Sequence, residues 1–235
     1  MKILALDTAT EACSVALWVD GVVHAEAREL ARGHAQHILP MVDALLGAHA
    51  LQLADLDAIA VGRGPGGFTG VRLAVGVAQG LALGAGLPAV GISDLAAVAQ
   101  AVFDRDALAT HVLACNDARM KEVYTGLFAR GAAGLAVPDG AERVAPPDSV
   151  AVPPSSGPQP RRVIGAGRGF RAFPQLARRL HGELASIDDS ILPGAGEIAR
   201  LAAAAFRRGE AVAPENLQPV YLRDDVAIPA VTILK

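Results

Sequence analysis

The sequence predicts an α/β protein of two lobes, each built on a mixed sheet. A buried strand that ends in an aspartate, then a polar turn, then an alternating strand occurs twice, with Asp7 and Asp117 in the same place. Helical patterns follow both copies. The chain has 235 residues, enough for one large domain or two small lobes. We therefore interpret the pattern as a weak internal duplication, although strand–turn–strand units are common.

The first half of the chain predicts a hairpin sheet followed by alternating helices and strands. The pair Asp20–Gly21 is a hairpin signal, and Pro40 is expected to kink or break the first helix. The expected strands are residues 2–7, 14–20, 22–30, 56–62 and 87–93, and the expected helices are 34–51, 68–84 and 94–103.

The second half predicts a similar order, interrupted by a proline-rich segment at residues 138–160 that reads as a surface loop or extended edge. Gly182 and Gly209 end its two helices. The expected strands are residues 111–117, 123–130 and 161–167, the expected helices are 172–182 and 195–209, and a terminal element follows at 219–225.

These elements predict lobes at residues 1–106 and 107–214, with residues 215–235 rejoining the first lobe. Two lobes that each open with strand–turn–strand and close with helices predict the ASKHA architecture of actin-like ATPases and sugar kinases.

Composition limits the functional classes. The formal net charge is −3 and the arginine pairs are scattered, so we expect no tight nucleic-acid binding by this chain alone. Cys13 and Cys115 are isolated and lack metal-ligand spacing, which indicates a reduced, cytoplasmic protein. Arg72 and Gln79 interrupt the best apolar run, residues 71–87, so we expect no membrane span. The N-terminus is too short for a signal peptide and lacks a cleavage site.

A glycine-rich loop, "GRGPGG", lies between a strand and a helix. Gly62, Gly64 and Gly67 match G-x-G-x-x-G, and the next strand leads to Asp94, as in a dinucleotide fingerprint. Pro65 removes one of the amides that would contact pyrophosphate. An NAD enzyme built on residues 62–94 stays one alternative because of the glycine spacing, although Pro65 counts against it.

The helix after this loop carries Gly76, Gly80 and Gly84 on one narrow stripe. Each glycine costs roughly 0.8–1 kcal/mol relative to alanine inside a helix. Such a stripe permits close approach of another backbone. It packs either on the protein's own sheet or on another helix, and we favour an exposed contact surface.

Other candidate chemistry is sparse. His34 and His37 lie three residues apart on one helical face, where a metal or, more simply, a polar face beside an interface is expected. Asp7 either coordinates a magnesium–phosphate group or is satisfied by turn amides. The charged turn of Asp117, Arg119 and Glu122 faces either a partner or shared ligand, or forms a local ion pair. Tyr124 and Tyr221 are expected to be core and edge residues.

Several motifs together resemble the TsaB (YeaZ) family over nearly the whole chain. They are "ILALDTATEACSVAL", the "HxQxILPMV" of residues 34–42, "GRGPGGFTGVR" with "AQGLALG", "DARMKEVY" and "PVYLR". No resemblance covers residues 131–160.

The resemblance implies an ASKHA fold and a role in making N6-threonylcarbamoyladenosine (t6A) at position 37 of tRNA. It implies a non-catalytic subunit that pairs with TsaD and is joined by TsaE with ATP, the transfer itself taking place on TsaD. It also implies a homodimer when the chain is alone, through the first two helices that TsaD also uses. No cofactor is expected on this chain alone, and ATP or ADP is expected in the complex with TsaD and TsaE.

Departures from TsaD fit this role. Asp94 and Val98 stand where the resemblance places a histidine metal pair, so we expect no metal. Thr8 and Ala9 follow Asp7 without the usual glycine, which weakens an independent ATP site.

The predicted site is thus a partner-binding face, with no catalytic residue. The nucleotide-proximal candidates are Asp7, Thr8 and Arg119. The partner-binding residues are His34, His37, Ile38, Met41, Leu45, Phe68, Thr69, Arg72, Leu73, Gly76, Gly80 and Gly84. The main alternative is an ATPase or small-molecule kinase acting alone through Asp7 and the loop of residues 62–67.

Overall fold

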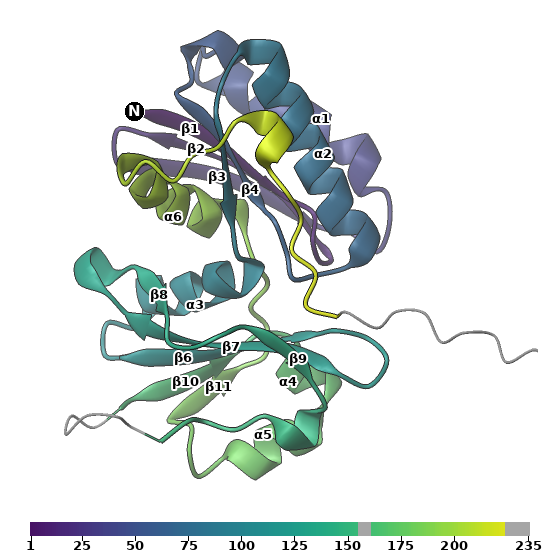
Figure 1. Cartoon of the computed structure of the whole chain (residues 1–235), viewed down its shortest axis with the longest axis vertical. Coiled ribbons are helices and arrows are strands. Elements are labelled where there is room, and N and C mark those ends of the chain that lie inside the picture. Colours follow the sequence, from purple (N-terminus) through teal and green to yellow (C-terminus); the bar gives the residue numbers. More distant parts are fainter. Residues whose placement is uncertain (155–160, 224–235) are drawn as a thin grey trace, which may run out of the picture.

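The computed structural model describes residues 1–154 and 161–223, and it has two stacked sheets with helices between and outside them (Figure 1). The layers run from two long helices, through the first sheet, two central helices and the second sheet, to two short helices. This two-lobed α/β arrangement confirms the predicted fold class.

The first sheet has the order β3-β2-β1-β4-β5. Strands β1 to β3 pair antiparallel, whereas β1, β4 and β5 pair in parallel. The predicted hairpin turn has Asp20 at φ 48° and Gly21 at φ 102°, both in the left-handed region that a two-residue turn requires. The strands are β1 (Lys2–Asp7), β2 (Ala12–Val19), β3 (Val22–Glu29), β4 (Ala58–Gly62) and β5 (Ala89–Ile92).

The second sheet repeats this topology with the order β8-β7-β6-β10-β11, and β9 pairs with β7. Its parallel and antiparallel pairs occur in the same places as in the first sheet. The duplication inferred from the sequence is therefore present in the strand order. The strands are β6 (His111–Asp117), β7 (Val123–Arg130), β8 (Ala136–Pro138), β9 (Arg143–Ala145), β10 (Val163–Ala166) and β11 (Ser186–Asp188).

Two helices cover the outer face of the first sheet, α1 (His34–Ala48) and α2 (Phe68–Ala85). Helix α1 continues through Pro40 without a break. The outer face of the second sheet is covered by the shorter α4 (Gly169–Ala172) and α5 (Pro174–Leu180).

The central helices exchange lobes. Helix α3 (Asp94–Arg105) follows the first sheet but packs on β6, β7, β8 and β10 of the second. Helix α6 (Ala195–Arg207) follows the second sheet but packs on all five strands of the first. The lobe boundaries at 106/107 and 214/215 stay a prediction, and these two helices join the lobes through one continuous core.

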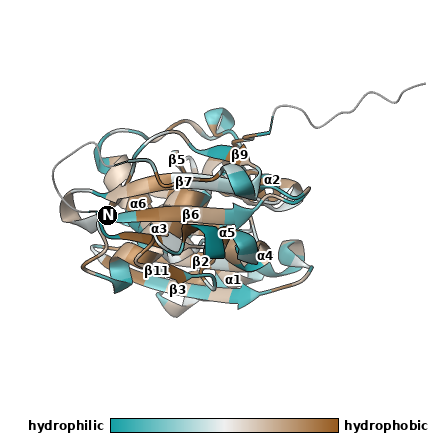
Figure 2. Cartoon of the chain, turned by 90° about the horizontal axis from the view of Figure 1, so that it is seen from below, coloured by the Kyte–Doolittle hydropathy of each residue, from teal (hydrophilic) through white to brown (hydrophobic). Residues whose placement is uncertain are grey.

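Burial follows the strand patterns. Strand β6 is hydrophobic along most of its length between hydrophilic ends (Figure 2). Its alternate residues face opposite sides, with Val112 and Ala114 toward the central helices and Leu113 and Cys115 toward α4 and α5. Each sheet is therefore covered by apolar side chains on both faces.

The proline-rich segment contains β9 and a short 3-10 turn at Pro147–Ser149, and residues 155–160 lie outside the described residues. After α6 and a second turn at Pro214–Asn216, the chain passes over the glycine loop, where the Val220 amide donates to the Arg63 carbonyl at 2.7 Å. The terminal element expected at 219–225 has no regular structure up to residue 223.

Candidate functional site

The glycine loop is packed against the protein's own chain. A β-carbon on Gly64 would lie 2.7 Å from the Val220 carbonyl oxygen, and one on Gly66 would lie 2.7 Å from that of Ala9. The Gly64 amide donates to the Asp94 carboxylate, and the Gly67 amide donates to the Ala9 carbonyl at 2.7 Å. The loop glycines therefore permit close internal packing, and these amides do not face a phosphate.

The dinucleotide alternative is wrong on topology. It requires an open parallel sheet in which β4 comes first, whereas β4 lies between β1 and β5 of a mixed sheet that opens with an antiparallel hairpin. Gly62 faces Asp7 and Asp94 rather than an open crevice.

The nucleotide-proximal candidates do not form an open phosphate site. Asp7 is fully buried, and burial is the main cause that raises its pKa to about 6. Thr8 is also buried, and its hydroxyl donates to the Gly70 carbonyl at 2.7 Å, which ties the β1–β2 turn to the first turn of α2. Both side chains thus have hydrogen-bond partners within the fold, and their place beside a nucleotide stays a prediction.

Arg119 lies in a strained turn between β6 and β7. Arg119, Met120 and Lys121 have φ values of 61°, 51° and 64°, which are uncommon for residues with side chains. The Arg119 guanidinium donates to Asp117 at 2.9 Å and lies 3.6 Å from Glu11 of the first lobe. The local ion pair weighed from the sequence is therefore present.

A second arginine connects the lobes at the same edge. Arg168 lies 2.8 Å from Glu29 and 3.7 Å from Glu11, and the hydrogen bond from Arg168 lowers the pKa of Glu29. Glu11 thus places a carboxylate beside Arg119 and Arg168 at the edge where the lobes meet.

The glycine stripe of α2 faces outward. Gly76, Gly80 and Gly84 are exposed, and a β-carbon on any of them would meet no atom of the described part of the chain within 4 Å. The alternative in which the stripe packs on the protein's own sheet is therefore wrong. The inner face of α2 covers the sheet with Val71, Ala74, Val75, Ala78 and Ala82.

Helix α2 is unusually apolar for so exposed an element. By length and composition alone it would suffice to cross a membrane, yet it packs on a sheet through one face and only 28% of it is buried. We expected Arg72 and Gln79 to exclude a membrane span, but the helix meets the length and composition criterion in spite of them. Leu83, near its C-terminal end, is 72% exposed.

An aromatic–arginine cluster lies at the N-terminal end of α2. The Arg72 guanidinium stacks 3.5 Å from the ring centroid of Phe68, and its Nε donates to the Tyr221 hydroxyl at 2.7 Å. Phe68 is 58% exposed and Thr69 is also exposed, whereas Leu73 is half-buried. Tyr221, expected at a core or edge, is part of this exposed cluster, which sequence spacing could not indicate because 149 positions separate it from Arg72.

Three predicted partner-binding residues of α1 are buried. Ile38, Met41 and Leu45 lie in the core between α1 and the first sheet. Their three- and four-residue spacing marks the inner stripe of an amphipathic helix, so the prediction placed them on the wrong face. The exposed face of α1 instead carries Leu39, Pro40, Asp43, Ala44 and Gly47.

The two histidines of α1 are half-buried near its start. Nε2 of His34 is buried without a hydrogen-bond partner. Within residues 1–154 and 161–223, no three histidine, cysteine, aspartate or glutamate side chains gather as a metal site would require. Val98, which with Asp94 stands where the resemblance places a histidine metal pair, is a core residue.

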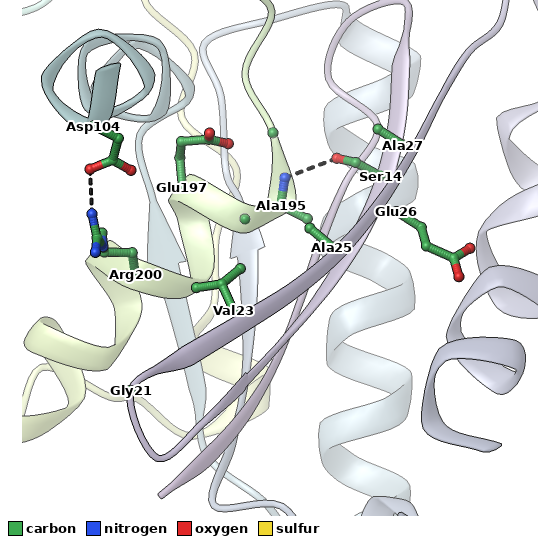
Figure 3. A pocket seen from close by; sticks show the side chains of 12 residues that line it. Ser14, Gly21, Val23, Ala25, Glu26, Ala27, Asp104, Ala195, Glu197 and Arg200 are labelled. Atoms are coloured by element: carbon green, nitrogen blue, oxygen red, sulfur yellow. Dashed lines mark hydrogen bonds and ion pairs between the residues drawn. The ribbon is translucent and has the colours of Figure 1, made fainter. Parts of the chain in front are cut away.

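A hollow of about 400 Å³ lies elsewhere, between β3 and the start of α6 (Figure 3). The Ala195 amide donates to the Ser14 hydroxyl at 3.0 Å, and Arg200 pairs with Asp104. Small side chains of β3 form its wall. None of the residues predicted to bind a partner or nucleotide lines it.

Comparisons with known proteins show the family of the chain. The family model described as "TsaD: tRNA N6-adenosine threonylcarbamoyltransferase" matches residues 19–230. A protein of Escherichia coli K12 named "tRNA threonylcarbamoyladenosine biosynthesis protein TsaB" is 44% identical over 229 residues, which cover 97% of this chain and 96% of that protein. The same name is given to a Haemophilus influenzae protein that is 39% identical over 96% of this chain and 95% of its own.

A solved structure has the same fold. "YeaZ from Pseudomonas aeruginosa" matches with a TM-score of 0.83 and 42% identity, and the match covers 94% of this chain and 99% of that one.

Proposed function

The chain belongs to the TsaB (YeaZ) family, and from this premise we propose that it is a non-catalytic subunit of the machinery that makes t6A at position 37 of tRNA. It pairs with TsaD and supports the TsaE- and ATP-dependent transfer of the threonylcarbamoyl group to the adenosine. The observation that carries the proposal is the bare outer face of α2.

Energetics favour a covered rather than a free face. The three glycines cost α2 about 2.5–3 kcal/mol relative to alanine, and no described residue packs closely on them. A partner helix laid along the stripe approaches closely because no β-carbon intervenes. The apolar Leu39 and Leu83 of the two outer helices add area that is favourable to bury.

The polar residues argue against chemistry by this chain alone. Asp7 is buried against Asp94, the Gly64 and Gly67 amides donate within the chain, and Arg119 and Arg168 are paired with carboxylates. This geometry disfavours the alternative of an ATPase or kinase that works through Asp7 and the glycine loop. We propose that nucleotide enters the assembly with TsaD and TsaE.

The remaining assignments follow from the same premise. Alone, the chain forms a homodimer through α1 and α2, and TsaD competes for that surface. The net charge of −3 supports tRNA contact only through the complex. A reaction on tRNA and two free, buried cysteines fit a cytoplasmic protein.

The test is reconstitution. Purified chain, TsaD and TsaE are mixed with tRNA, ATP and threonylcarbamoyl-adenylate, and t6A is measured by mass spectrometry of digested tRNA. We expect t6A only when all three proteins are present, and ATP hydrolysis by the chain alone at background. Unchanged t6A formation without this chain, or robust ATPase activity of the chain by itself, would contradict the proposal.

A further inference from the structure

Two buried carboxyl groups meet beneath the glycine loop, and the proposed function does not use them. Asp7 ends β1 and Asp94 begins α3, and both are fully buried. Gly62 separates them so narrowly that a β-carbon there would lie 2.5 Å from an oxygen of Asp94 and 2.6 Å from one of Asp7. Both carboxyl groups therefore face the same point.

Each carboxyl group has one satisfied and one unsatisfied oxygen. Oδ1 of Asp7 accepts from the Ala9 amide at 2.9 Å, and Oδ2 of Asp94 accepts from the Gly64 amide. Oδ2 of Asp7 and Oδ1 of Asp94 are buried and accept from no donor among the described residues. One proton on either of these oxygens supplies the missing donor, and the other oxygen accepts it.

We propose that Asp7 and Asp94 retain one proton, held on Asp94 Oδ1 and donated to Asp7 Oδ2, and that this bond fastens the glycine loop to β1. The unfolded chain releases that proton to solvent at neutral pH.

Electrostatics support a retained proton. Burial raises the pKa of Asp94 well above its ordinary value, and the charge of Asp7 raises it further, as does the more distant Glu142. Glu142 accepts from the Ser93 hydroxyl, and Arg63 is the cation near it. The buried Cys13 thiol also lies in the field of Asp7. Among residues 1–154 and 161–223, no cation is a main influence on the pKa of either carboxyl group, so two ionised carboxylates are not favoured.

The pair is a joint for three elements. Asp94 binds the loop twice, since its backbone amide also donates to the Gly64 carbonyl at 3.1 Å. The Ala9 carbonyl, next to the amide held by Asp7, accepts from Gly67 just before α2. The pair thereby positions Phe68 and Arg72 at the start of α2. This consequence rests on the proposed function, whereas the retained proton does not.

The decisive experiment compares the thermal melting of the wild type, D7N, D94N and D7N/D94N between pH 5 and 8. Asp148→Asn, an exposed site with the same change of charge, is the control. An asparagine at either position supplies a permanent donor, so D94N should melt about 5 °C above wild type at pH 8, with the gap narrowing toward pH 5. D148N should follow the wild type.

The sign follows from the raised pKa values. The retained proton contributes stability fully below the unfolded pKa of 3.8, and that contribution is lost as pH rises through the folded pKa values, which for Asp7 is about 6 and for Asp94 is well above 3.8. The wild type should therefore lose stability across this range, and D94N should lose less.

The double variant separates a shared hydrogen bond from simple removal of charge. In D7N/D94N the oxygen of each asparagine side chain still accepts from the Ala9 or Gly64 backbone amide, so the two NH2 groups face each other. Because two donors then meet without an acceptor, the double variant should melt below either single variant. The proposal is overturned if the double variant is the most stable, if D94N melts below the wild type throughout, or if millimolar Mg²⁺ raises the wild-type melting temperature and the asparagines abolish that rise.

A second readout tests the joint. Asp94→Ala leaves the Gly64 amide without its acceptor and should weaken capture of TsaD at least tenfold, whereas D94N should bind as the wild type does. Equal binding by both variants contradicts the positioning role. Failure of the folded wild type to bind TsaD would instead refute the proposed function, and the melting results would still decide the retained proton.

Discussion

The two lobes share one strand order but differ in the layer that covers their outer faces. The first sheet is covered by helices of 15 and 18 residues, the second by helices of 4 and 7 residues. The outer helices of the second lobe expose Arg171, Arg178 and Arg179 to solvent. Helix α2, one of the two outer helices of the first lobe, exposes Gly76, Gly80, Gly84 and Leu83.

The two lobes thus share the strand order of their sheets but not the residues that their outer helices expose. Both sheets need an apolar layer on each face, so the buried residues of the two lobes are alike in kind. The exposed residues are free to differ. Arginines keep one outer layer hydrated, whereas small and apolar residues make the other suitable for a partner.

The largest expected effect tests which face of α1 is core. Ile38→Ala removes a fully buried side chain and should lower the free energy of unfolding by about 2–5 kcal/mol. Its neighbour Leu39 is 45% exposed, so Leu39→Ala should change stability by less than about 0.5 kcal/mol. Urea unfolding measures both. Similar losses in the two variants would mean that α1 does not present Leu39 to solvent.

The next effect tests the glycine stripe as a docking surface. Gly80→Leu adds bulk to the open face and should weaken association with TsaD by about 2–4 kcal/mol, measured by calorimetry. The variant protein should remain folded, because leucine favours helix more than glycine does. Gly182→Leu, at an exposed glycine of the second lobe with equal space around it, is the matched control. Normal binding by Gly80→Leu would place the interface elsewhere.

A third pair contrasts the two sides of α2. A β-carbon on Gly70 would lie 2.0 Å from the Thr8 carbonyl oxygen, so Gly70→Ala should cost about 1–3 kcal/mol of stability or more through overpacking. Gly76→Ala should instead stabilise the lobe by about 0.8–1 kcal/mol, since nothing lies near that position. Chemical denaturation at neutral pH compares them. A loss in both variants would show that the stripe is covered within the chain.

The smallest effect lies at the edge where the lobes meet. Arg168→Met removes the ion pairs with Glu29 and Glu11 and should lower the melting temperature by less than about 3 °C at low salt. Because the pKa of Glu29 is lowered, the contribution is present above its ordinary value of 4.5 and is lost as pH falls through the lowered value. Scanning calorimetry at pH 7 and pH 3, with and without 0.5 M salt as a roughly saturating screen, measures it. A difference that persists at pH 3 in high salt would indicate lost packing instead.

Local patterns were enough for most of the fold. Period-two alternation and buried runs predicted eight of the eleven described strands closely or in part, and the repeated strand–turn–strand unit predicted the duplication. Strands β8, β9 and β11 were missed because each has three residues, too few to establish a period, and their places are set by pairing with β7 or β10. The exchange of α3 and α6 was also missed, since amphipathicity shows that a helix has an apolar face but not which sheet receives it.

The candidate site was also predicted only in part from the sequence. Spacing placed three glycines on one stripe but could not say that the stripe faces outward. It also placed Ile38, Met41 and Leu45 together, on the face that turned out to be core. Tyr221 and the pairing of Asp7 with Asp94 depend on segments far apart in the chain, which no window of sequence joins.

The sequence by itself therefore determined the periodicities, the repeated strand–turn–strand unit, the turn at Asp20–Gly21 and the family resemblance, because these depend on neighbours within a few residues or on the motif set as a whole. Only the tertiary structure decided which face of α1 is buried, that the glycine loop is filled by residues 9 and 220, and that two acidic residues meet under Gly62. The physical reason is that burial, and the proton balance that burial imposes, depend on every element packed around a residue and not on its own segment.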